Sequence, residues 1–182
     1  SSSTMLPQII KPFKSMIQFF QPDSSMGSEL NDHQNNNTPV QAPIAFSAQL
    51  ISSLQAEHRQ VVELYRKVGM HVQRSEFQKI PQQLGHLKRE FHRHLMHEDL
   101  LFYGYIERKF ADQLEQLNRI QSYRKQISSV SNRFNKFTDK WQNQLLNAQN
   151  IQQFQTEYNA MGDLLTQHLN HEEQQLYPLY QR

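Results

Sequence analysis

The chain has 182 residues, a formal net charge of +2 and no cysteine. The length suits one domain with an additional arm, and the absence of cysteine excludes disulfides, thiolate metal sites and cysteine nucleophiles. Lysine and arginine are dispersed among aspartate and glutamate, which argues against a nucleic-acid partner. No apolar run is long enough to form a transmembrane segment, and a cysteine-free chain of this kind is expected to be cytoplasmic.

Residues 1–45 differ from the rest and are expected to form an irregular N-terminal arm. Within it, residues 6–20 carry apolar side chains around two lysines, and two prolines interrupt any long helix. An arm that packs on its own bundle or on a partner is favoured, and a segment lying on a membrane surface is the alternative. Residues 21–43 are rich in Ser, Asn, Gln and Pro, which indicates a linker.

Residues 46–182 are expected to form one all-α domain, because glycine and proline are scarce and no alternating strand pattern is present. Apolar residues three and four positions apart predict four amphipathic helices, over about 46–71, 77–109, 112–147 and 151–180. Ser75 is a candidate N-cap of the second helix, with Gln78 as its capping-box partner. Four helices of similar length with short turns predict an up-down-up-down antiparallel four-helix bundle.

The third predicted helix, over 112–147, carries an apolar seam without histidine or carboxylate. We expect this helix to contribute packing. Its Tyr123 is interpreted as a packing residue, and a tyrosine that ligates the metal or hydrogen-bonds to a ligand is the alternative. The seam consists of ten residues: Leu114, Leu117, Ile120, Tyr123, Ile127, Val130, Phe134, Phe137, Trp141 and Leu145.

One ten-residue motif occurs twice, in the second and the fourth predicted helix. It reads His-Leu-x-His-Glu-acid-x-x-apolar-Tyr and covers residues 94–103 and 168–177. The first His and the Glu of each copy lie four residues apart, about one helical turn. Both residues fall in the apolar seam of their helix, and the seam of the first copy continues through Leu101 and Tyr105.

The first predicted helix adds a third histidine to a seam, His58. Counted from the predicted turns at about 1.5 Å per residue, five polar seam residues share one middle level of the bundle, and His168 lies level with Val130. Buried carboxylates and imidazoles are costly unless they are paired or bound to a metal. One such histidine is more often a satisfied core residue, but five at one level favour a metal site: His58, His94, Glu98, His168 and Glu172.

Imidazole together with carboxylate suits iron, manganese or zinc rather than calcium. A carboxylate can bridge two ions, so the five residues could hold one metal or two. His97 and His171 precede the glutamate of each copy and point toward a helix flank. Two interpretations of them stay open: a supporting role beside the ligands and a solvated flank.

These motifs resemble the hemerythrin-like (HHE cation-binding) domain family over about residues 46–180. The likeness rests on His94-x-x-x-Glu98 with Leu101-Phe102-Tyr103, on His168-x-x-x-Glu172 with Leu176-Tyr177-Pro178, and on Glu57-His58. It implies a four-helix bundle with a non-haem iron site, usually di-iron, near its middle. The resemblance implies the same five candidate ligands.

The third helix departs from that family pattern. Members that bind oxygen reversibly usually carry one or two histidines there, and this chain has none between His97 and His168. The departure argues against oxygen carriage and leaves open a depleted di-iron site, a mononuclear site or another ion.

The leading hypothesis is a hemerythrin-like protein with non-haem iron as its cofactor, mononuclear or dinuclear. It would bind or sense O2, NO or redox state, or handle iron. One alternative is a di-iron enzyme acting on peroxide or NO, although no acid–base pair away from the ligands is evident. A second alternative is a metal-free interaction bundle that has lost the full site.

Overall fold

The computed structural model describes residues 44–182, and the regular structure of this part is entirely helical, without strands. The all-α prediction is therefore confirmed. Four long helical segments follow one another: α2 (Leu50–Gln73); α3 (Ile80–His97) with its continuations η2 (Glu98–Tyr103) and α4 (Gly104–Lys109); α5 (Leu114–Gln142); and α6 (Ile151–His171) with η3 (Glu172–Leu176) and η4 (Tyr177–Leu179). A single 3₁₀ turn, η1 (Phe77–Lys79), leads into α3.

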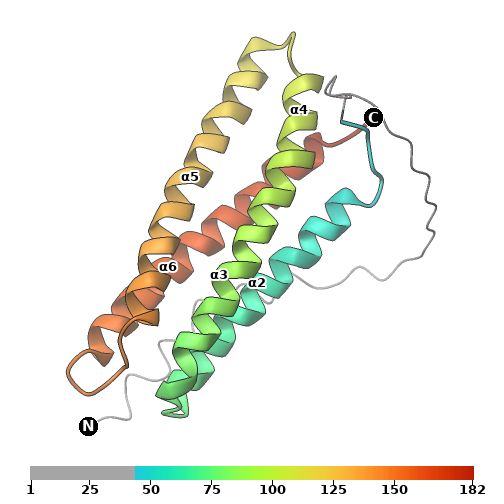
Figure 1. Cartoon of the computed structure of the whole chain (residues 1–182). Coiled ribbons are helices and arrows are strands. Elements are labelled where there is room, and N and C mark those ends of the chain that lie inside the picture. The colour runs from blue at the N-terminus through green and yellow to red at the C-terminus, as the bar shows by residue number, and fades with distance from the viewer. Residues whose placement is uncertain (1–43) are drawn as a thin grey trace, which may run out of the picture.

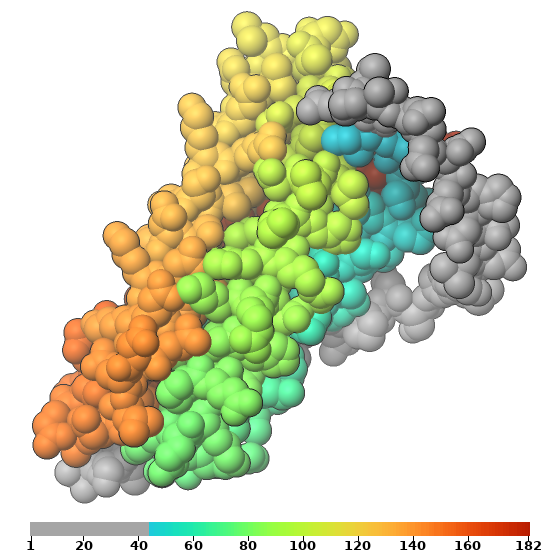
Figure 2. Space-filling model, viewed as in Figure 1, coloured from blue at the N-terminus to red at the C-terminus, as the bar shows by residue number. Residues whose placement is uncertain are grey.

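The four segments pack side by side as a bundle, and Figure 1 shows each of the three later segments running in the opposite direction to the one before it. In Figure 2, α2, α3 and α5 cover α6 on the visible face, so that only small areas of α6 remain in view. Among residues 44–182, no helix combines the length and the apolar character that crossing a membrane requires.

The core consists of two apolar clusters, and the polar seam residues lie between them. Along α2, His58 stands between Leu54 of one cluster and Val61 of the other. Along α3 and η2, the pair of His94 and Glu98 stands between Phe91 and Phe102 in the same way. Apolar packing on both sides therefore holds one polar layer inside the bundle.

Both copies of the repeated motif leave α-helical geometry at their glutamate, where the sequence predicts uninterrupted α-helix. Turns η2 and η3 are π-helical, and π-turns have i→i+5 hydrogen bonds and are frequent at functional sites. Residues four and five positions apart then share a face, so Phe102 and Tyr103 are buried, whereas Leu101 is 40% exposed. The prediction that Leu101 lies in the buried seam is wrong for this reason.

Helix α5 ends at Gln142 rather than near residue 147. The chain then leaves the helix, so Leu146 is buried while Leu145 is 57% exposed. Leu114, at the opposite tip of α5, is 72% exposed, and the predicted burial of both leucines is wrong. Because α5 is shorter than predicted, the turn from which the residue levels were counted begins earlier in the chain. Tyr123 rather than Val130 therefore lies beside His168.

The described chain before α2 packs against the C-terminal end. The ring of Phe46 stacks on Tyr180 with 4.8 Å between ring centroids, and the backbone N–H of Ser47 donates to the Tyr180 hydroxyl at 2.8 Å. The predicted arm segment 6–20 and the linker 21–43 lie outside the described residues, so the domain boundary near residue 45 stays a prediction.

Candidate metal centre

The five predicted residues come from three of the four helical segments, and all five are buried. His58 lies in α2, and His168 lies in the last turn of α6. His94 lies in the last turn of α3, and the two glutamates are the first residues of the π-turns: Glu98 of η2 and Glu172 of η3. The π-turns thus begin at the two carboxylates, and α5 contributes none of the five.

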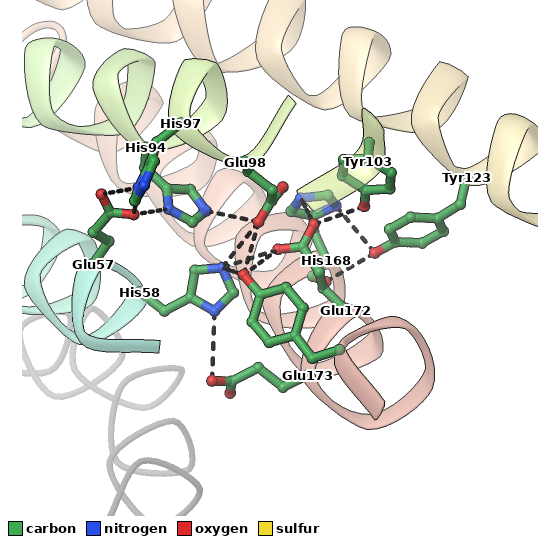
Figure 3. Close-up of polar contacts among 11 residues, drawn as sticks. Glu57, His58, His94, His97, Glu98, Tyr103, Tyr123, His168, Glu172 and Glu173 are labelled. Atoms are coloured by element: carbon green, nitrogen blue, oxygen red, sulfur yellow. Dashed lines mark hydrogen bonds and ion pairs between the residues drawn. The ribbon is translucent and has the colours of Figure 1, made fainter. Parts of the chain in front are cut away.

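Four of the five converge, as Figure 3 shows. His58, His94, Glu98 and Glu172 each offer one ligand atom, and these atoms lie within 4.8 Å of one another. The Nε2 atom of His58 is 2.9 Å from Glu172 Oε1 and 3.9 Å from Glu98 Oε2. Donor atoms from three segments therefore enclose a volume that one cation could fill.

His168 stands at the edge of this group rather than within it. Its Nε2 is 3.6 Å from Glu172 Oε2. Its Nδ1 lies 3.2 Å from the Tyr123 hydroxyl, which also donates to the His168 backbone carbonyl at 2.9 Å. The two rings are parallel within 2°, so Tyr123 fixes the imidazole with Nε2 toward the carboxylates.

Two of the buried imidazoles have a nitrogen without a hydrogen bond. His94 Nε2 lies 3.1 Å from Glu98 Oε2 but is not aligned for a hydrogen bond, and His168 Nε2 forms none with any residue of 44–182. Buried polar atoms in native proteins are nearly always hydrogen-bonded, and an exception calls for a cause such as a bound ion. Nitrogen atoms that face carboxylate oxygens in this way fit metal coordination.

The buried carboxylates influence each other strongly. Burial raises the pKa of Glu172 well above its usual value, and the nearby charge of Glu98 adds to this effect. Burial would also raise the pKa of Glu98, but its contacts with His94 lower it below the usual range. Two buried carboxylates at this separation thus resist double ionisation, and a cation between them would remove that obstacle.

Two of the candidate histidines, His94 and His168, have pKa values that are shifted in opposite directions. Burial lowers the pKa of His168 to about 4. For His94, burial acts in the same sense, but its contacts with Glu57 and Glu98 outweigh burial and raise the pKa. His168 is therefore neutral near pH 7 and has a lone pair available for a metal.

Glu57 contacts two histidines of the centre, a role that sequence reasoning did not assign although Glu57-His58 was part of the family motif. Its Oε2 is 3.0 Å from His94 Nδ1, and its Oε1 is 2.9 Å from His97 Nδ1. Because a carboxylate only accepts, the neutral His94 ring carries its hydrogen on Nδ1 and directs the Nε2 lone pair toward Glu98. A charged residue directly before His58, at the edge of the seam, was the signal available in the sequence.

The contact with Glu57 bears on the two interpretations of His97, a supporting role beside the ligands or a solvated flank. This histidine is a half-buried partner of Glu57 rather than a member of the converging group. Its counterpart His171 stacks on Tyr123, with 4.6 Å between ring centroids. Both flanking histidines thus contact residues that orient a candidate ligand.

The tyrosine at the end of each copy of the motif donates a hydrogen bond to the glutamate of the other copy. The Tyr103 hydroxyl, in the first copy, donates to Glu172 Oε2 at 3.0 Å. The Tyr177 hydroxyl, in the second copy, donates to Glu98 Oε2 at 2.7 Å. Each π-turn brings its tyrosine inward to the glutamate of the other copy, a role that was not predicted although both tyrosines were part of the repeat.

Two surface cavities reach the centre on the side of α5. Glu98 and Tyr103 line a cavity of about 400 Å³ between α3 and α5. Tyr123 and His171 line a second one of about 660 Å³. Open space therefore comes up to a candidate ligand, Glu98, and to the ring that contacts His168.

Comparison with known proteins identifies the same part of the chain. The sequence model of the hemerythrin HHE cation binding domain family matches residues 49–180. The match spans α2 to η4 and includes all five predicted ligands. No curated protein and no solved structure matches the chain significantly.

Proposed function

The chain belongs to the hemerythrin HHE cation-binding family, and on that premise we propose that it holds non-haem iron inside the bundle, as one ion or two. Its proposed role is the binding or sensing of O2, NO or redox state, or the handling of iron. The proposed protein ligands are His58, His94, Glu98, His168 and Glu172.

One observation carries this proposal. Four donor atoms from buried side chains lie within 4.8 Å of one another, and the Nε2 atoms of His94 and His168 form no hydrogen bonds within residues 44–182. Such an arrangement is costly without a cation, because carboxylates and imidazoles lose their hydration on burial. The mixture of nitrogen and oxygen donors suits iron.

The chain would hold and shield the ion with its own residues. Iron with imidazole and carboxylate ligands supplies a centre that can take a small diatomic ligand or change its oxidation state. The two apolar clusters keep bulk water from the polar layer on both sides. Glu98 and Glu172 offset the positive charge, and the cavity beside Glu98 gives a small molecule an approach from the α5 side.

The Glu57→Gln variant is expected to bind iron about 10- to 100-fold more weakly, which is the usual effect of removing a partner of a ligating histidine. The amide cannot accept from His94 as strongly as the carboxylate does, so the ring loses its fixed orientation. Iron affinity would be measured by competition with a chelator of known strength.

Glu63→Gln is the matched control for that variant. Glu63 lies in the same helix, is 48% exposed and pairs with Arg66 at the surface. We expect its iron affinity to equal that of the wild type. Equal affinities in all three proteins would contradict the role of Glu57.

Removing the metal is expected to destabilise the protein. A ligand that binds only the folded state at 100 times its dissociation constant contributes about 2.7 kcal/mol. Iron-loaded protein treated with a chelator should therefore lose about 2–3 kcal/mol of unfolding free energy. Urea unfolding with and without chelator measures the loss, and elemental analysis of the same samples gives the iron content.

That experiment, together with a turnover assay on the iron-loaded protein, separates the alternatives. An iron-free protein whose stability does not change on chelation would be the metal-free interaction bundle. An iron-loaded protein that turns over peroxide or NO would be the enzyme. The expectation of a cytoplasmic location rests on composition alone and stays a prediction.

A further inference from the structure

The hydroxyl of Tyr177 lies within the group of proposed ligands. It is 2.7 Å from Glu98 Oε2, 3.0 Å from His58 Nε2 and 3.3 Å from Glu172 Oε1. These three atoms belong to η2, α2 and η3. The phenol oxygen thus touches three members of the four-residue group, each from a different segment.

Packing holds the Tyr177 ring in this position. Its ring stacks on His58 with 5.4 Å between centroids and meets the edge of Phe102 at 5.1 Å. The side chain is only 3% exposed. Since η4 begins directly after the π-turn η3, the backbone that places Glu172 also places Tyr177, and the hydroxyl has little freedom to point elsewhere.

The three contacts use the full hydrogen-bonding capacity of the hydroxyl. A phenol has one hydrogen to donate and two lone pairs. The hydrogen goes to Glu98 Oε2, the shortest contact, so the lone pairs face the same small volume as the atoms of His58 and Glu172. Oxygen and nitrogen donors that enclose one volume from several sides are the usual surroundings of a cation.

We propose that Tyr177 is itself a metal ligand, an oxygen donor to ferric iron that joins His58, Glu98 and Glu172. This inference rests on the proposed function, since it requires iron at the site. It gives the centre a donor that the histidine-free helix α5 does not supply. On coordination the phenol O–H bond is replaced by an oxygen–iron bond, and the proton leaves to solvent; no oxidant or reductant is consumed.

Two other buried tyrosines at the centre are differently placed. Tyr103 donates to Glu172 Oε2, and Tyr123 contacts His168 on the nitrogen that faces away from the carboxylates. Within residues 44–182, neither hydroxyl forms a hydrogen bond with more than one of the five proposed ligands. Tyr103→Phe and Tyr123→Phe therefore remove a buried hydroxyl at the same site without removing the proposed ligand.

The test uses the full chain loaded with ferric iron. Coordinated tyrosinate gives a visible charge-transfer band, and resonance Raman spectra excited in that band contain tyrosine ring vibrations. Relative to the iron bound in each sample, we expect both signals at the same strength in the wild type, in Tyr103→Phe and in Tyr123→Phe. In Tyr177→Phe we expect both to be lost while iron remains bound, as measured by elemental analysis of the same sample.

The possible outcomes separate this inference from the proposed function. Wild-type protein that binds iron without the band, or Tyr177→Phe that retains it, would overturn the tyrosine ligand alone. Wild-type protein that binds no iron would overturn the proposed function as well. If Tyr177→Phe does not fold or binds no iron, the iron-loaded forms of the other two variants decide: a band retained in both supports Tyr177, and a band lost in either while iron remains bound overturns the assignment.

Discussion

The His94→Ala variant is expected to bind iron more than about 100-fold more weakly than the wild type, since even a partner of a ligating histidine contributes about 10- to 100-fold. His94 is 1% exposed, its Nε2 lies 3.1 Å from Glu98 Oε2 and its Nδ1 is held by Glu57. Alanine removes the donor and leaves both carboxylates without that partner. Chelator competition and the iron content of purified protein measure the effect.

His86→Ala is the matched control, because His86 lies on the same helix but is exposed. We expect its iron content to equal that of the wild type. Equal, substoichiometric iron in wild type, His94→Ala and His86→Ala would contradict the metal site. Circular dichroism of each variant verifies that the bundle is intact.

His168→Ala adds information about the number of ions. Because His168 lies outside the tight group of four, its loss acts differently in the two cases. A single ion among the four would remain bound with lower affinity. Two ions per chain would fall to one, because the second ion would lack its imidazole.

Phe91→Ala is expected to reduce the free energy of unfolding by about 3–5 kcal/mol, the usual range for truncating a buried phenylalanine. Phe91 is fully buried, and its ring lies 4.5 Å from that of Phe134 across the interface of α3 and α5. Neighbouring rings fixed by helices on both sides cannot close the cavity that alanine leaves. Urea unfolding of chelator-treated protein measures the loss without a contribution from metal.

Leu114→Ala is the control for that prediction. Leu114 is 72% exposed at the tip of α5, so we expect a change within about 0.5 kcal/mol, as for most surface substitutions. The sequence alone predicts a large loss here as well, because Leu114 fits the apolar seam. A loss above 2 kcal/mol at Leu114, or below about 1 kcal/mol at Phe91, would contradict the packing described for α5.

The helices were predictable because their periodicity is strong, and their ends were not. Apolar residues at three- and four-residue spacing identify α2, α3, α5 and α6, since only one face of each helix is buried. Where a seam ends depends on the length of the neighbouring helices. For this reason Leu145 fits the pattern of α5 but lies beyond its end.

Likewise, some residues of the candidate site could be recognised from the sequence and others could not. His94, Glu98, His168 and Glu172 were recognisable because a repeated polar pair inside an apolar seam is costly and therefore conspicuous. Glu57 and Tyr177 were not, because their roles depend on contacts with other segments. Glu57 is 37 residues from His94, and Tyr177 is 79 residues from Glu98; no local pattern relates such positions.

By itself, then, the amino-acid sequence determined that this protein is a helical bundle with a buried layer of histidine and glutamate. Periodicity and the cost of burying polar groups are properties of a single helix and can be seen in one stretch of chain. Only the tertiary structure decided that the helices become π-turns at both glutamates, that Tyr103 and Tyr177 cross to the opposite carboxylate, and that His168 stands outside the group of four. Those features depend on distances between segments, and such distances arise only when the whole bundle has packed.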